Sequence, residues 1–142
     1  MGHLAIGYLI GTLISKFTKE KINIPLIFFF SILPDIDIFI PELEHRSITH
    51  SVVLALILFI PIILISKSGF AYFGALASHT LIGDYFNGTS FQLFWPVSNE
   101  YFISPISLTM FGSAEFFIEC GLFAIMVFFI IQQMRKQRSN KS

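Results

Sequence analysis

Five apolar segments, separated by short polar stretches, form the main pattern of this chain. They cover residues 4–15, residues 22–33 with an apolar extension to residue 40, and residues 51–66, 69–83 and 113–131. A helix that crosses a membrane needs about 20 apolar residues at a rise of about 1.5 Å each, and only the last segment reaches that length comfortably. The pattern predicts an all-α chain with four to five transmembrane helices. A short segment either spans with the bilayer thinned beside it or forms a re-entrant or interfacial helix.

The composition supports a membrane protein. Of the 142 residues, 54% are hydrophobic, 18 are Phe and only 13% are charged, whereas about 25% are charged in a typical soluble domain. A soluble domain of this size cannot bury so much apolar surface. The balance of 9 basic and 9 acidic residues excludes a nucleic-acid binder that acts through bulk positive charge. We expect one membrane-embedded domain over residues 1–142, with the lipid bilayer as its main partner.

The basic residues orient the predicted helices. If the N-terminus lies outside and successive helices alternate in direction, all but one of the 9 Lys and Arg residues fall on the cytoplasmic side, as the positive-inside rule expects. These are Lys16, Lys19, Lys21, Lys67, Arg135, Lys136, Arg138 and Lys141. The exception is Arg46. The charges therefore predict a cell-membrane protein with its N-terminus outside and its C-terminus in the cytoplasm.

The same topology brings the residues that commonly bind metals to the outer face. They are His3, Asp35, Asp37, His45, His50, His79 and Asp84. Imidazole and carboxylate groups together bind zinc and similar divalent ions, and this set suffices for one ion or for two ions about 3.5 to 4 Å apart. Pro34 disfavours helix at Leu33, so we expect an extended stretch in which Asp35 and Asp37 point to the same side.

Each of these residues also has a simpler interpretation. His3 alone suits a membrane interface, and Asp35 alone suits a helix cap or turn. His45 and His50 suit a polar loop. His79 can form a plain hydrogen bond with a neighbouring carboxylate, although an ionisable group within an apolar helix is costly. A single site explains all of these positions together, whereas the simpler interpretations need a separate reason for each.

Two further residues are candidates for substrate chemistry. The guanidinium of Arg46 suits an anionic phosphate or carboxylate, or else it pairs on the surface with Glu42 or Glu44. Glu119 lies about one turn inside the last apolar segment and shares a helix face with Glu115. It acts either as a further ligand or general base, or as a carboxylate that snorkels at the helix start.

Several motifs resemble those of the YdjM family of membrane-bound, metal-dependent hydrolases. They are His3 near the start, Leu33-Pro34-Asp35-Ile36-Asp37, His45-Arg46-Ser47-Ile48-Thr49-His50-Ser51, Ser78-His79 through Asp84, and Leu93-Phe94-Trp95-Pro96. The resemblance covers residues 1–97, and the region after residue 98 is not clearly matched. It implies an all-α fold that binds clustered metals, with a distant relation to the zinc-dependent phospholipase C and single-strand nuclease superfamily. It thereby implies hydrolysis of a phosphoester bond.

One spacing departs from the pattern that this resemblance leads us to expect. The expected pattern is His-x-x-x-Asp, which stacks both side chains on one helix face, whereas His79 and Asp84 are one residue further apart. In a regular α-helix their spacing separates them by about 140°. Either the helix ends or bulges at Gly83 and re-aims Asp84, or Asp84 is not a direct metal ligand.

We therefore expect a membrane-bound, metal-dependent hydrolase with its site at the outer membrane surface, zinc as the ion, and a phosphoester or lipid-like substrate. The first candidates for ligands are Asp35, Asp37, His50 and His79, followed by His3 and His45. Two alternatives stay open. A transporter or channel usually carries ionisable groups near the membrane midplane, where the predicted spans have none. A non-catalytic membrane scaffold leaves the cluster of histidines and aspartates without a role.

Overall fold

The computed structural model describes residues 2–87, 90–104 and 113–139, without the side chains of residues 113–115 and 137. The elements, in chain order, are α1 (Gly2–Thr18), α2 (Ile24–Ile32), η1 (Leu33–Phe39), η2 (Ile48–His50), α3 (Val52–Ile65), α4 (Gly69–Ser78), η3 (His79–Asp84), β1 (Ser90–Phe91), β2 (Phe102–Ile103) and α5 (Ser113–Ser139). Two of the short helices, η1 and η2, are 3-10 helices, and η3 is a π-helix. The predicted helical fold is confirmed, with one short antiparallel β1–β2 pair added to it.

Local sequence signals explain where α2 and α3 begin. Ser51 accepts a hydrogen bond of 3.1 Å from the Leu54 N–H and so caps α3, which follows the predicted segment closely. Asn23 caps α2 by accepting a hydrogen bond of 3.3 Å from the Leu26 N–H, and a proline follows in the first turn. α5 continues past the predicted end at residue 131 as far as Ser139.

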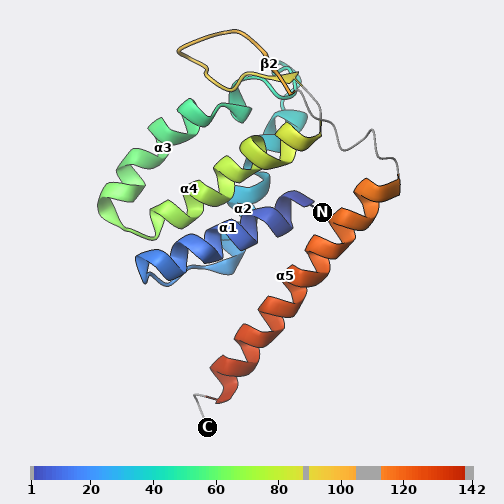
Figure 1. Cartoon of the computed structure of the whole chain (residues 1–142). Helices are drawn as coiled ribbons and strands as arrows, with labels where there is room; N and C mark the ends of the chain where they lie inside the picture. The colour runs from blue at the N-terminus through green and yellow to red at the C-terminus, as the bar shows by residue number, and fades with distance from the viewer. Residues whose placement is uncertain (1, 88–89, 105–112, 140–142) are drawn as a thin grey trace.

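Small residues allow α1, α2 and α4 to pack closely. A side-chain carbon at Gly11 would lie 2.6 Å from Ile27 Cδ1 and 3.3 Å from the Ala71 carbonyl oxygen, so a larger residue would have to displace the Ile27 side chain. Gly7 faces Ser31 of α2 in a similar way, since a side-chain carbon at Gly7 would lie 2.6 Å from Ser31 Cβ. Close approach through small residues is typical of membrane helices. The core lies where these helices meet, and Figure 1 shows α1, α2 and α4 side by side.

α5 is the one helix within the described residues that is long and apolar enough to cross a membrane. Its apolar stretch Phe116–Lys136 has 21 residues, and only 6% of the most apolar window is buried inside the protein. Met126 joins α5 to the core. Figure 1 shows α5 extending away from the other helices toward its C-terminal end. α5 is thus the candidate membrane span, and spanning by the four other helices stays a prediction.

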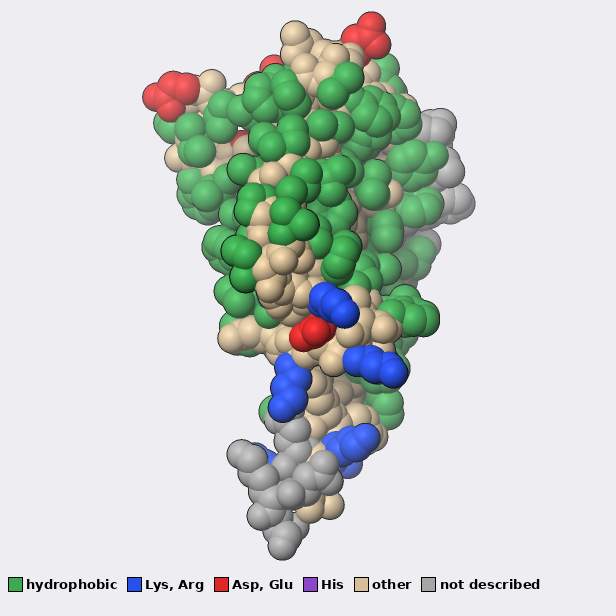
Figure 2. All heavy atoms as spheres, turned by 90° about the vertical axis from the view of Figure 1, so that its left-hand side faces the viewer, with side chains coloured by type: hydrophobic (Ala, Val, Ile, Leu, Met, Phe, Trp, Pro, Cys, Tyr) green, Lys and Arg blue, Asp and Glu red, His purple; other side chains and the backbone are tan. Residues whose placement is uncertain are grey.

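Charged and apolar side chains occupy different parts of the surface. Figure 2 shows Lys and Arg side chains gathered at the lower end of the molecule, below a broad hydrophobic surface. Lys16 and Lys136 lie in the last turns of α1 and α5. Large apolar side chains such as Leu58, Leu64 and Ile65 of α3 are exposed. An apolar surface of this extent is unfavourable in water and suits contact with lipid.

Candidate metal centre

The candidate metal ligands lie together at the end of the fold opposite the lysines. His3 is in the first turn of α1, and Asp35 lies in η1 directly after α2. His50 ends η2 just before α3, and His79 and Asp84 are the first and last residues of η3 at the end of α4. Because successive helices alternate in direction, four separate chain segments meet at one place.

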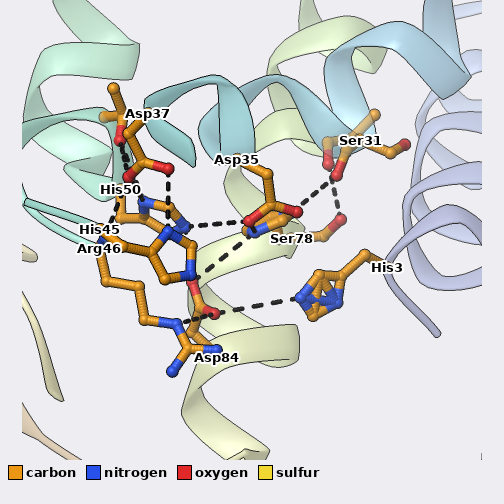
Figure 3. Close-up of polar contacts among 12 residues, drawn as sticks. His3, Ser31, Asp35, Asp37, His45, Arg46, His50, Ser78 and Asp84 are labelled. Atoms are coloured by element: carbon orange, nitrogen blue, oxygen red, sulfur yellow. Dashed lines mark hydrogen bonds and ion pairs between the residues drawn. The ribbon is translucent and has the colours of Figure 1, made fainter. Parts of the chain in front are cut away.

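Two buried histidines and two carboxylates form the centre of the site. His50 and His79 are 0% exposed. Their Nε2 atoms lie 3.6 Å and 3.3 Å, respectively, from Asp35 Oδ1. The same two nitrogen atoms lie 3.5 Å and 3.9 Å from Asp84 Oδ2. Figure 3 shows the side chains of Asp35, His50 and Asp84 pointing toward one another.

The two Nε2 atoms make no hydrogen bond within the part of the chain that the structure describes. Leaving a buried polar group unsatisfied costs about 1–3 kcal/mol. Burial alone would raise the pKa of the Asp35 carboxyl, but the imidazoles of His50 and His79 hold the pKa well below its ordinary value. An ionised carboxylate within 3.6 Å of two imidazole nitrogens that lack a hydrogen bond among the described residues is a donor set that fits a divalent metal ion.

The other ring nitrogen of each histidine is held by the protein. His79 Nδ1 donates a hydrogen bond of 2.7 Å to the Ser31 carbonyl oxygen at the end of α2. His50 Nδ1 lies 3.1 Å from Thr49 Oγ1 and 3.3 Å from Asp37 Oδ2. Since acceptors face both Nδ1 atoms, the proton of each neutral ring resides there and the Nε2 lone pair faces the centre. Metal-binding histidines are commonly oriented in this way.

Asp37 holds the loop that carries His45 and Arg46. Its Oδ1 accepts a hydrogen bond of 2.9 Å from His45 Nδ1. Its Oδ2 accepts hydrogen bonds from the Arg46 N–H at 2.9 Å and from the Thr49 hydroxyl at 2.7 Å. Burial alone would raise the pKa of the Asp37 carboxyl, but these three contacts hold the pKa below its ordinary value. Asp37 therefore acts as an ionised anchor for the residues around the centre.

The expected extended stretch around Asp35 and Asp37 is wrong. Residues Leu33–Phe39 form the 3-10 helix η1, with Pro34 in its first turn. Pro34 is compatible with this position because the first turn of a helix needs no N–H donor from it. At about three residues per turn, side chains two residues apart point in different directions. Asp35 therefore faces the two Nε2 atoms, whereas Asp37 faces the loop.

A π-turn places Asp84 at the centre. The Tyr85 N–H bonds to the Thr80 carbonyl oxygen five residues earlier, which widens the helix over His79–Asp84. Side chains five residues apart then lie closer to one face of the helix than they do in a regular α-helix. Of the two alternatives left open by the long His79 to Asp84 spacing, the bulged helix is the one observed, and it re-aims Asp84 toward the histidines.

His3 completes the group from the side of α1. Its Nε2 lies 4.0 Å from Asp84 Oδ1, and its ring centroid lies 4.0 Å from that of His79. The ring rests against Gly83, where a side-chain carbon would lie 2.6 Å from His3 Cε1. Glycine at position 83 is therefore what allows the imidazole to reach the centre.

Arg46 enters the site from the loop. Its Nε lies 3.5 Å from Asp84 Oδ1, so its side chain turns toward the centre. Glu44, the surface partner considered for Arg46, instead accepts a hydrogen bond of 2.8 Å from the Tyr101 hydroxyl.

The backbone of Arg46 has a φ of 65°, a left-handed conformation that costs a non-glycine residue about 1–3 kcal/mol. Hydrogen bonds on both sides, to Asp37 and from the Gln92 N–H (3.1 Å), hold this conformation. Such strain is typical of functional positions.

Glu119 lies close to Gly2, in the cavity that His3 also lines. A side-chain carbon on Gly2 would lie 2.9 Å from Glu119 Oε1. Glu119 and His3 both line a cavity of about 320 Å³ between α1, η3 and α5. The side chain of Glu115, its expected neighbour on the same helix face, lies outside the described residues.

The structure arranges all seven candidate ligands in overlapping groups. The three groups are His3 with His79 and Asp84, Asp35 with His50 and His79, and Asp37 with His45 and His50. In each group the possible ligand atoms lie within 4.8 Å of one another. The supporting roles of the Ser31 carbonyl and of Thr49 were not predicted from the sequence pattern. A backbone carbonyl leaves no trace in the residue type, but the position of Thr49 within the His45–His50 motif was an available signal.

The family described as YdjM inner membrane protein matches residues 1–139. This range extends past residue 98, where the motifs end, and includes α5. Neither the search of curated proteins nor the search of solved structures found a match.

Proposed function

The chain belongs to the YdjM family of inner membrane proteins, and from this premise and the arrangement of its buried histidines we propose that it is a membrane-bound hydrolase that depends on a divalent metal ion. One observation carries the proposal. His50 and His79 are buried, and each has its Nδ1 facing an acceptor. Within the part of the chain that the structure describes, each leaves Nε2 without a hydrogen bond beside two carboxylates. A purely structural cluster would satisfy these nitrogens with partners in the protein.

We assign the ion to the centre of the group formed by Asp35, His50, His79 and Asp84, with His3 as an adjoining ligand. Two nitrogens and two carboxylates suit zinc, which is our first choice. When bound, such an ion supplies Lewis-acid polarisation of the substrate and lowers the pKa of a coordinated water to about 7. Asp37 and the Ser31 carbonyl orient the imidazoles, and this support commonly changes metal affinity 10- to 100-fold, as an order-of-magnitude expectation.

A second ion is less well supported. The group of Asp37, His45 and His50 has the donor types for one. However, Asp37 Oδ1 lies 2.9 Å from His45 Nδ1, and Asp37 Oδ2 already accepts two further hydrogen bonds. A second ion would have to replace these bonds. We therefore propose one ion at the centre and a hydrogen-bonded support around it.

The charged residues around the centre suit an anionic substrate. Arg46, whose side chain is 27% exposed, presents its guanidinium beside Asp84. Its remaining N–H donors suit the oxygens of a phosphoester. Glu119 lies close to Gly2 and lines the same cavity as His3, where its carboxylate is the candidate to accept a proton from water. The proposed substrate is a phosphoester or a lipid-like molecule, approached from the extracytoplasmic side.

The experiment that tests this function uses full-length protein in lipid nanodiscs. Metal content is measured first, and hydrolysis of bis(4-nitrophenyl) phosphate is then measured with the metal-loaded protein and with the D35N variant. Turnover in the wild type, together with its loss in D35N, supports the proposed hydrolase activity. Metal without turnover favours a non-catalytic metal-binding protein, and transmembrane movement of the ion in proteoliposomes favours a transporter.

A further inference from the structure

A cavity lies directly beside the metal centre, on the side of α1 that faces α5. Its volume is about 320 Å³, which is at the lower end of the range for small-molecule sites, about 300–1,000 Å³. Most of its wall is apolar and is formed by Ile6, Ile82, Phe86, Ile118 and Leu122. The cavity is therefore suited to an apolar group of limited size.

The cavity and the metal centre share a wall. His3 lines the cavity and also lies 4.0 Å from Asp84 Oδ1. Gly83, which the His3 ring touches, lines the same cavity. A molecule that binds at the centre can thus extend past His3 into the cavity without crossing the core of the fold.

Polar and apolar recognition lie on opposite sides of the centre. Figure 3 shows Arg46 and His3 approaching the Asp84 carboxylate from two different sides. The Arg46 side suits an anionic group, whereas the His3 side leads to the cavity, whose lining is mainly apolar and carries Glu119 and Asn87 as further polar residues. The outer wall of the cavity belongs to α5, the candidate membrane span. This order of charge, metal ligands and apolar wall matches an amphiphile with a phosphoester next to an alkyl chain.

We propose that this cavity binds the alkyl chain of the substrate, so that the protein selects phosphoesters that carry a long apolar chain. This inference rests on the proposed function and adds the substrate class to it. Chain binding removes apolar surface from water and fixes the phosphoester beside Arg46 and the central ligands. The cavity thereby determines specificity, while the residues of the centre are the same for any chain length.

The test compares two phosphodiesters that differ only in chain length, methyl 4-nitrophenyl phosphate and dodecyl 4-nitrophenyl phosphate. In both, the oxygen of water adds to phosphorus and the bond to the nitrophenyl oxygen breaks. The products are an alkyl phosphate monoester, 4-nitrophenolate and a proton. The measured quantity is the ratio of kcat/KM for the dodecyl ester to kcat/KM for the methyl ester, in nanodiscs of constant composition.

Two isoleucines of α5 supply matched variants. Ile118 lines the cavity and is 45% exposed, whereas Ile125 is 46% exposed and does not line it. We expect I118W to lower the chain-length ratio about tenfold or more by filling the cavity, and I118A to leave or raise it. I125W should leave the ratio unchanged. Both tryptophan variants are measured in the same lipid, so partition of the dodecyl chain into the bilayer affects them equally and does not contribute to the difference between them. Equal ratios for I118W and I125W would overturn the proposal.

A binding measurement separates this inference from the hydrolase. Dodecylphosphonate, which has no ester bond to cleave, is titrated into metal-loaded protein, with methylphosphonate as the short-chain probe. The proposal expects the dodecyl compound to bind more tightly than the methyl compound. If I118W abolishes this preference and I125W retains it, the result supports chain binding in the cavity even if no ester is hydrolysed. Hydrolysis of both esters with a ratio that I118W does not change rejects the cavity and leaves the hydrolase standing. Metal content of each variant shows that the centre has formed.

Discussion

His79 and Asp84 lie on the same side of one widened helical turn, although five residues separate them along the chain. The π-turn that begins at His79 brings Asp84 Oδ2 to 3.9 Å from His79 Nε2 and to 3.5 Å from His50 Nε2. π-turns are uncommon and occur frequently at functional sites. Here the turn serves the centre, because a regular α-helix would aim the Asp84 carboxylate away from the histidines.

The first prediction separates Asp35 from Asp37. We expect D35N to lose most of the bound metal, because it removes a carboxylate that faces both Nε2 atoms. D37N should retain the metal with affinity lowered about 10- to 100-fold, since Asp37 orients His50 without facing the centre. Titration of zinc into chelator-treated protein measures both affinities. Equal losses in the two variants would contradict the separate roles.

The second prediction concerns Gly83. G83A should lower zinc affinity by about as much as H3A, because the added carbon displaces the His3 ring. In the H3A background the same substitution should cost little, since the ring is no longer there. A double-mutant cycle on zinc affinity measures this coupling. Additive effects of the two substitutions would show that His3 and position 83 act independently.

Arg46 gives the third prediction. We expect R46K to keep the metal but to lower kcat/KM for a phosphodiester about tenfold or more, and R46A to lower it further, because lysine keeps the charge without the planar fork. R46K keeps the same backbone strain, so a difference between R46K and the wild type reports on the side chain. Near-normal turnover by both variants would remove Arg46 from substrate binding.

Topology is the fourth prediction. A reporter fused after Ser142 should be cytoplasmic, and one inserted near Asn87 should be external, as the positive-inside rule requires for the lysine-rich end. Paired fusions to an enzyme active only outside and to a fluorescent protein active only inside measure each position. If both positions report the same side, the orientation of α5 relative to the metal centre is wrong.

The sequence predicts the helices and the composition of the site better than it predicts local geometry. The apolar run of α3 is flanked by a polar residue at each end, and in the structure these residues, Ser51 and Ser66, are the caps of the helix. Side-chain types identify the seven candidate ligands because histidine and aspartate are costly near lipid. The direction of Asp37 was not predictable, since a proline near a helix end permits either an extended stretch or a 3-10 helix. The hydrogen bond from His79 to the Ser31 carbonyl depends on tertiary packing, which no residue type encodes.

The close contact of Gly7 with Ser31 has a consequence for the candidate metal centre. Ser31 packs against α1 at Gly7, and its carbonyl oxygen holds His79 Nδ1. The spacing between α1 and α2 therefore affects the orientation of the His79 imidazole, which we propose as a metal ligand. G7A should push α2 away and weaken zinc binding, whereas G121A should not, because position 121 has open space around it. Zinc titration of the pair measures how far a change in the helix interface is transmitted.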